Sequence, residues 1–167
     1  MSDSLKIRAA TPGDIPVLLE MIRELADYEK LSDLVRATEE LYQEALFGEH
    51  PAAEALIAEH DGRPAGYAVY FATFSTFLAI QGIWLEDIFV RPEYRKAGTG
   101  RALLSAVASR LIERGGDRLE WSALKWNELA LGFYRGLGAQ TMDEWVTHRL
   151  IGDDLHRLAA DSSRPAA

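Results

Sequence analysis

The sequence predicts a single α/β domain with a mixed β-sheet. Short apolar strands alternate with amphipathic helical segments, and a Gly-rich turn follows a buried strand and opens a long helix. The 167 residues are also enough for one hydrophobic core. The expected order of elements is β-α-α-β-β-β-α-β-α-β. We expect the domain to span residues 1–152 and residues 153–167 to form a loosely ordered tail, because its end is polar and contains proline and alanine.

Apolar periodicity and turn signals place the elements of the first half. Thr11 and Pro12 form a typical helix start, and the Asp61-Gly62 pair is typical of a hairpin turn. The expected elements are a strand at 5–8, helices from Thr11 to about Tyr28 and from Thr38 to near Gly48, and strands at 55–59 and 64–74.

The same signals continue through the second half. Residues 83–90, IWLEDIFV, are typical of a buried strand, and Gly115-Gly116 ends the helix that follows the Gly-rich turn. Asn127 suits the N-cap of a further helix. The expected elements are a strand at 83–90, a helix from Gly100 to Gly115, a strand at 119–124, a helix from Asn127 to Gly138 and a strand at 145–151.

Composition narrows the function classes. The chain has no cysteine, which excludes disulfides and a thiol nucleophile and fits a reducing cytoplasm. No apolar run is long enough for a bilayer, so we expect no membrane span and no export. The net charge of −8 argues against nucleic acid and is compatible with a cationic substrate, although many proteins are acidic for solubility alone. The four histidines lack metal-ligand spacing, so we expect no metal.

The segment Arg95-Lys96-Ala97-Gly98-Thr99-Gly100 is a candidate site for a pyrophosphate. Glycine lets the backbone approach a ligand closely, and the N–H groups that open a helix attract anions together with the helix dipole. A tight strand–helix turn with no ligand is the alternative. The segment lacks the Gly-Lys-Ser/Thr of a P-loop and comes too late in the chain for a Rossmann fingerprint. The remaining candidate ligand is the pyrophosphate of a carrier such as coenzyme A.

Several blocks of sequence resemble one family. Arg95-x-x-Gly98-x-Gly100 matches the coenzyme A signature of the GNAT superfamily of N-acetyltransferases, Arg/Gln-x-x-Gly-x-Gly/Ala. From about Ile7 to Leu150 the chain is similar to the diamine (spermidine/spermine) acetyltransferase branch, which includes enzymes acting on thialysine. The blocks that carry this likeness are LADYEK at 25–30, FGEHP at 47–51, LEDIFV at 85–90, YRKAGTG at 94–100 and KWNELALGFYRGLGA at 125–139. Lys96 departs from the glycine of many relatives and adds a cation.

The resemblance implies a GNAT fold, in which a mixed, mostly antiparallel sheet is splayed between its fourth and fifth strands where acetyl-CoA enters. It also implies a homodimer, acetyl-CoA as cosubstrate and a small amine as substrate. The residues expected at the coenzyme are Ile88, Phe89, Val90, Arg95, Lys96, Ala97, Gly98, Thr99, Gly100, Arg101, Asn127, Glu128, Leu129, Ala130 and Tyr134. The residues expected at the amine are Tyr28, Glu29, Glu86, Glu120, Trp121, Ser122 and, by a looser match, Glu144.

Acetyl transfer to an amine sets three chemical requirements. An alkylamine with a pKa near 10.4 is only about one part in 10³ neutral at pH 7, and Glu86 either accepts its proton or binds the ammonium. A backbone N–H near Ile88 meets the charge that develops on the thioester oxygen. Tyr134, which falls on the family's catalytic tyrosine, donates a proton to the leaving thiolate.

The expected function is acetyl transfer from acetyl-CoA to a primary amine of a small cationic, diamine- or polyamine-like substrate. We expect direct attack within a ternary complex, because the sequence offers no covalent nucleophile. The alternatives are an acetyltransferase for thialysine, another amino acid or a protein amine, and a non-catalytic sensor that only binds acyl-CoA. Release of thiol from acetyl-CoA with a panel of amines separates them.

Overall fold

A computed structural model describes residues 4–161 of the chain. These residues form two compact units, one ending at Ser122 and one beginning at Ala123. The strands are β1 (Leu5–Ala9), β2 (Glu54–His60), β3 (Arg63–Ser75), β4 (Ile80–Val90) and β5 (Arg118–Trp121). The α-helices are α1 (Ile15–Glu29), α2 (Glu39–Phe47), α3 (Thr99–Glu113), α4 (Glu128–Gly136) and α5 (Gly152–Asp161). Short 3₁₀ helices are η1 (Pro12–Asp14), η2 (Ser32–Leu34) and η3 (Pro92–Tyr94).

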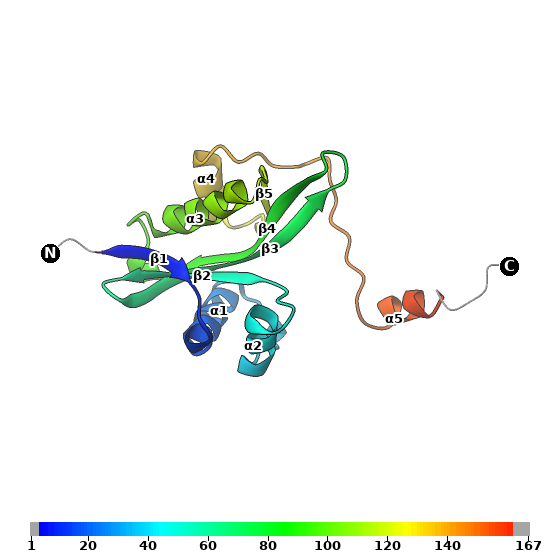
Figure 1. The fold of residues 1–167 in the computed structure, drawn as a ribbon, viewed down its shortest axis with the longest axis horizontal. Helices are drawn as coiled ribbons and strands as arrows, with labels where there is room; N and C mark the ends of the chain where they lie inside the picture. Colours follow the sequence, from blue (N-terminus) through cyan, green and yellow to red (C-terminus); the bar gives the residue numbers. More distant parts are fainter. Residues whose placement is uncertain (1–3, 162–167) are drawn as a thin grey trace. The chain divides into compact units, whose positions relative to one another are not determined.

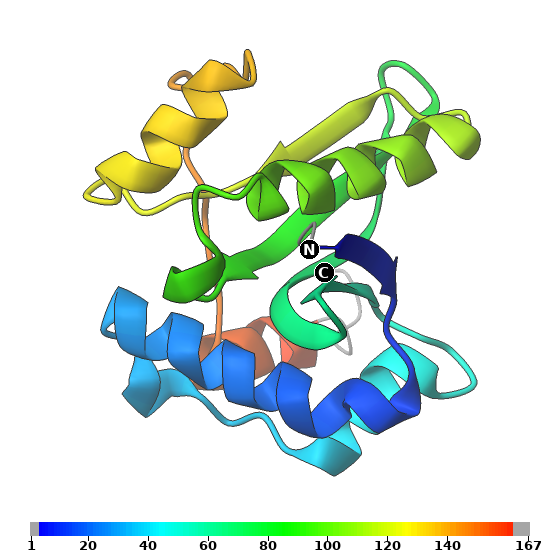
Figure 2. The same ribbon diagram turned by 90° about the vertical axis from the view of Figure 1, so that its left-hand side faces the viewer.

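The first unit is a mixed five-stranded sheet in the order β1-β2-β3-β4-β5. Its first four strands are antiparallel neighbours, whereas β5 runs parallel to β4. A parallel pair needs a crossover connection, and α3 provides it. Helices α1 and α2 cover one face of the sheet and α3 covers the other (Figures 1 and 2). This arrangement confirms the predicted α/β class.

The core lies on both faces of the sheet. The apolar stripe of α1, which includes Leu18 and Met21, packs with α2 against inward side chains of β2, β3 and β4. On the other face α3 buries Leu103 and Val107. Full burial of each such side chain contributes about 1.5–3 kcal/mol to folding. The helix face that carries these residues therefore packs against the sheet, as the apolar periodicity of the sequence predicts.

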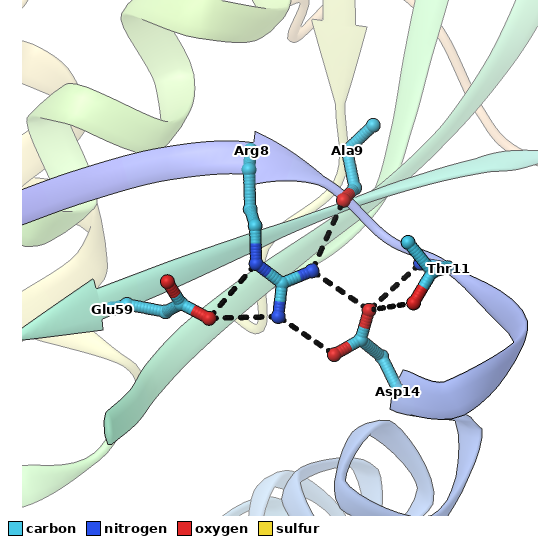
Figure 3. Close-up of polar contacts among 5 residues, drawn as sticks. All are labelled: Arg8, Ala9, Thr11, Asp14 and Glu59. Carbon is cyan, nitrogen blue, oxygen red and sulfur yellow. Dashed lines mark hydrogen bonds and ion pairs between the residues drawn. The ribbon is translucent and has the colours of Figure 1, made fainter. Parts of the chain in front are cut away.

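An ion-pair cluster anchors the first strand to its neighbour and to the start of α1. The Arg8 guanidinium binds Glu59 on β2 and Asp14 at the end of η1, with its terminal nitrogens 2.7 Å from carboxylate oxygens of Asp14 (Figure 3). Asp14 also accepts hydrogen bonds of 2.7 Å from the N–H and the hydroxyl of Thr11. The hydrogen bonds from Arg8 hold the pKa of the Asp14 carboxyl well below its usual range. The expected helix start at Thr11 and Pro12 is confirmed.

The sheet separates between β4 and β5. Within the described residues the two strands pair only from Gly82 opposite Arg118 to Leu85 opposite Trp121, and β4 then continues to Val90 with β3 as its single neighbour. The strands approach closely where they do pair, since a Cβ at Gly82 would lie 2.9 Å from the Arg118 carbonyl oxygen. The expected splay between the fourth and fifth strands is confirmed.

The prediction of a strand at 145–151 is wrong. Within residues 4–161 this segment joins no ladder, and Trp145, Val146 and Ile151 are 72%, 75% and 68% exposed. An alternating apolar pattern favours an extended chain, but a strand exists only when a neighbouring strand satisfies its backbone groups. The segment after it, where a loose tail was expected, contains α5, and residues 162–167 lie outside the described part of the chain. Among the described residues, no helix combines the length and apolar character needed to cross a bilayer.

Candidate active site

The Gly-rich turn has the geometry of an anion site. Lys96 and Gly98 both adopt left-handed backbone conformations, with φ of 63° and 83°. The Ala102 N–H donates to the Gly98 carbonyl oxygen at 2.9 Å, so the preceding N–H groups open α3 without an intrahelical acceptor. Apart from its chain neighbours, no described atom lies within 4 Å of the place a Cβ on Gly98 would take. Gly98, Lys96 and Arg101 are exposed around the start of α3, which fits a diphosphate on the open side of the turn.

Arg95 is oriented differently from the other cations of the turn. Its Nε donates to the Val90 carbonyl oxygen at 2.9 Å, and its guanidinium lies 5.2 Å from the Tyr28 ring centroid and 5.9 Å from that of Phe89. A guanidinium over aromatic faces is held by cation–π attraction. The side chain thus fastens the turn to the end of β4 and to α1, and its predicted role beside the coenzyme stays a prediction.

The end of β4 supplies backbone groups to the same region. Ile88, Phe89 and Val90 follow the point at which β5 separates, and each is paired with β3 on one side only within the described chain. The Phe89 side chain is buried in the core. The backbone contacts of these three residues with the coenzyme stay predictions.

A β-bulge lies where the two strands part. Val69 on β3 faces Asp87, whereas the next residue, Tyr70, faces Leu85, so Glu86 is an extra residue in β4. A bulge bends its strand and re-aims side chains, and bulges are frequent beside active sites. The Glu86 side chain is exposed and accepts a hydrogen bond of 3.0 Å from Trp84 Nε1.

Three carboxylates, Glu29, Glu86 and Asp87, form what we call the acidic cluster. Burial, followed by the charges of Glu86 and Glu29, raises the pKa of the Asp87 carboxyl to about 6. Burial also raises the pKa of Glu29. Like charges held together in a partly buried place favour either a shared proton or a bound cation.

Tyrosine hydroxyls border the acidic cluster. Burial raises the pKa of Tyr42, and the charges of Asp87 and Glu86 add to that effect. Tyr67 is fully buried, and its hydroxyl has no hydrogen-bond partner among the described residues. Burial raises its pKa well above the usual value, with the Asp87 charge as the next cause. Both hydroxyls therefore stay protonated and are potential donors next to Asp87.

Asp87 is a candidate functional residue that the sequence analysis did not select. The signal was present, because Asp87 is a carboxylate inside a mostly apolar strand and a buried charge is unusual without a function or a partner. Its burial could not be read from the sequence, since the bulge at Glu86 changes which residues face α1 and α2.

The other residues of the first unit that were expected at the amine, Glu120, Trp121 and Ser122, lie on β5 or directly after it. Glu120 is opposite Trp84, the residue that binds Glu86, and Trp121 is opposite Leu85. Glu120 forms an ion pair of 2.9 Å with Arg118. The sheet thus brings Glu86 and Glu120 to neighbouring positions, with the Glu120 charge partly neutralised.

The second unit holds the other predicted residues. Asn127 caps α4, accepting a hydrogen bond of 3.2 Å from the Ala130 N–H, as the sequence predicted. Tyr134 lies on α4 with its ring 5.4 Å from that of Phe133. Glu144 is exposed in the segment after α4. The roles of Asn127, Glu128, Leu129, Ala130, Tyr134 and Glu144 stay predictions. In residues 4–161 no group of three or more metal-ligating side chains comes together.

A Gly-rich turn that follows the fourth strand and opens a helix, beside a parallel strand pair that separates, is the arrangement expected of a coenzyme-dependent acyltransferase. The model of the Acetyltransferase (GNAT) family matches residues 18–139, and the chain belongs to this family. It is therefore an acetyltransferase of the GNAT type, whose family uses acetyl-CoA, which confirms the predicted class of enzyme.

Known relatives are consistent with this assignment. The chain is 39% identical to thialysine N-epsilon-acetyltransferase of Bos taurus, over 92% of this chain and 96% of that protein. It is 28% identical to spermidine/spermine N(1)-acetyltransferase-like protein 1 of Homo sapiens, over 94% of this chain but 24% of that protein. Among solved structures, the integron cassette protein VCH_CASS6 of V. cholerae is similar with a TM-score of 0.78 and 27% identity, over 93% of this chain and 98% of that one.

We expect Asp87→Asn to stabilise the folded protein near pH 7.5. The folded pKa of about 6 lies above the unfolded value, so the stability contributed by this carboxyl is complete at low pH and is lost as the pH rises through 6. Between about pH 4 and pH 7.5 the unfolding free energy of the wild type should fall by about 2–3 kcal/mol relative to the variant. Urea unfolding of both proteins at the two pH values measures this. Asp117→Asn, at an exposed aspartate, is the matched control, and equal pH dependence of wild type and Asp87→Asn would contradict the electrostatic account.

Proposed function

We propose that this acetyltransferase acetylates a small amine that carries a second ammonium group, such as a diamine, a polyamine or a diamino acid related to thialysine. The acidic cluster of Glu29, Glu86 and Asp87 is the observation that carries the proposal. One carboxylate is enough to receive the reacting amine, and the others then suit a second positive charge. The names of the two relatives support the same class, since thialysine and spermidine each have more than one amino group.

The turn and the adjoining strand end would hold the cosubstrate. The N–H groups from Lys96 to Arg101 fit the diphosphate of acetyl-CoA, and the backbone of Ile88, Phe89 and Val90 suits its pantetheine arm. Asn127 through Ala130 are proposed as further coenzyme-binding residues. When bound, acetyl-CoA supplies the activated acetyl group as a thioester. The protein supplies binding, proton acceptance and proton donation.

Proton acceptance is proposed for Glu86 together with Asp87. An ammonium must lose a proton before its nitrogen can attack, and a carboxylate whose pKa is close to the working pH is a better acceptor than an ordinary one. Burial brings Asp87 nearer to that condition, while Glu86 is exposed at the bulge and able to receive the ammonium first. Tyr134 is proposed as the proton donor to the leaving thiolate. The amine attacks directly, without a covalent enzyme intermediate.

The experiment that tests the function is thiol release from acetyl-CoA with an amine panel. We expect putrescine, spermidine, thialysine and lysine to include substrates whose kcat/KM exceeds that of n-butylamine by at least about tenfold, because a monoamine leaves part of the acidic cluster uncompensated. Comparable rates with n-butylamine would contradict the role of the acidic cluster. Coenzyme binding without thiol release on any amine would favour a non-catalytic sensor.

Replacement of the proposed proton donor gives a second test. We expect Tyr134→Phe to lower turnover at least about tenfold with little change in acetyl-CoA affinity, because only the hydroxyl is removed. Turnover and the Kd for coenzyme A are measured on the same preparation. Tyr70→Phe, which removes a hydroxyl that donates to Glu54 at 3.2 Å, is the control and should keep full turnover. Unchanged turnover in Tyr134→Phe would remove this residue from the mechanism.

We also propose that the protein is a homodimer and works in the cytoplasm. The exposed apolar residues Trp145, Val146 and Ile151 support an interface, because such a segment is costly to leave in water and lacks a partner strand among the described residues. Sedimentation at micromolar concentration should give twice the mass of one chain, and a monomer mass would contradict the dimer.

The absence of cysteine fits the proposed cytoplasmic location, because the cytoplasm is a reducing compartment. Cell fractionation tests this location.

A further inference from the structure

We infer that His60 is a positioning residue that fixes both ends of the coenzyme turn. The inference rests on the proposed role of that turn. His60 is the last residue of β2, far from the turn in sequence, and was not among the residues that the family resemblance selected. Its side chain is 3% exposed.

The His60 ring contacts the residue before the turn and a residue near the end of the turn. Its Nε2 lies 2.8 Å from the Thr99 hydroxyl oxygen, in the first turn of α3. Its face stacks on the Tyr94 ring, with centroids 5.1 Å apart and planes inclined by 17°. Tyr94 ends η3 and Thr99 begins α3. One buried side chain therefore contacts both of the elements that the turn connects.

The hydrogen-bond directions connect these contacts into one chain. The Thr99 hydroxyl donates its single hydrogen to the Tyr94 carbonyl oxygen at 3.1 Å. The hydroxyl oxygen must then accept from His60, which assigns the ring proton to Nε2. Thr99 is 1% exposed, so no solvent replaces this donor if it is removed. His60 therefore orients the Thr99 hydroxyl that closes the turn onto Tyr94.

The turn needs such fixing because its conformation is unfavourable. Lys96 has a φ of 63°, in the left-handed region that residues with a Cβ avoid. A backbone of this kind persists only where its surroundings hold it in place. Fixed ends keep the N–H groups of the α3 start directed to the open side, so they do not have to be ordered when the diphosphate binds. His60 thus acts on coenzyme affinity through Thr99 and Tyr94, without contact with the coenzyme.

Substitutions at His60 separate its two contacts. His60→Phe keeps an aromatic face for Tyr94 but loses the donor, and His60→Gln keeps an N–H donor but loses the ring. We expect His60→Phe to raise the Kd for coenzyme A and the KM for acetyl-CoA by about five- to tenfold, with kcat within about twofold. His60→Gln should show a smaller rise. Thr99→Val removes the same hydrogen bond from the other side, so its effect should not add to that of His60→Phe.

A matched control separates this effect from general destabilisation. Ser75→Ala removes a buried hydroxyl that accepts from the Leu78 N–H at 3.3 Å at the end of β3, and it should lower stability without changing coenzyme affinity. A folded His60→Phe protein with an unchanged Kd, or fully additive effects of the two substitutions, overturns the inference. If His60→Phe does not fold, Thr99→Val decides by the same Kd measurement.

A turn variant distinguishes failure of this inference from failure of the proposed function. Lys96→Glu places a negative charge at the proposed diphosphate site. If the wild type binds coenzyme A and Lys96→Glu weakens binding while His60→Phe does not, the turn is correct and the role of His60 is wrong. If the wild type does not bind coenzyme A, the proposed coenzyme turn fails and the role of His60 fails with it.

Discussion

The candidate site depends on the incomplete pairing of β4. Within the described residues this strand is paired on both edges from Gly82 to Leu85 and with β3 alone from Asp87 to Val90. A backbone edge inside a folded domain is unstable unless something satisfies its N–H and carbonyl groups. The open edge, the Gly-rich turn and the start of α3 follow one another directly along the chain, so a ligand that binds backbone groups meets all three at once.

The β-bulge coincides with the point where the strands part. Leu85 is the last residue that pairs with β5, and Glu86 is the extra residue of the bulge. One irregularity thus ends the regular ladder and presents two consecutive carboxylates beside Glu29. Burial of Asp87 costs stability near neutral pH, since the charged form is disfavoured there. A cost of this kind is commonly retained where the charge has a function.

Opposite electrostatic preferences lie at the two ends of this arrangement. The turn presents helix N–H groups with Lys96 and Arg101 and therefore favours an anion, while the acidic cluster favours a cation. Arg95 contacts elements that carry both groups. Its guanidinium stacks on Tyr28, which precedes Glu29 in the chain, and its Nε donates to the carbonyl oxygen at the end of β4. Arg95 therefore links α1 to the turn, and both candidate binding regions depend on its position.

Local signals in the sequence determined the strands and helices of the first unit, the cap at Asn127 and the Gly-rich turn, because each depends on residues close together in the chain. Glu86 was selected by the family resemblance, and its role stays a prediction. The bulge, the burial of Asp87, the inward position of Arg95 and the contact of His60 with Thr99 depend on strand register and long-range packing, which no short stretch of sequence reveals. The segment 145–151 shows the same limit. Its pattern favours a strand, but a strand also requires a neighbouring edge, and no local pattern can specify one.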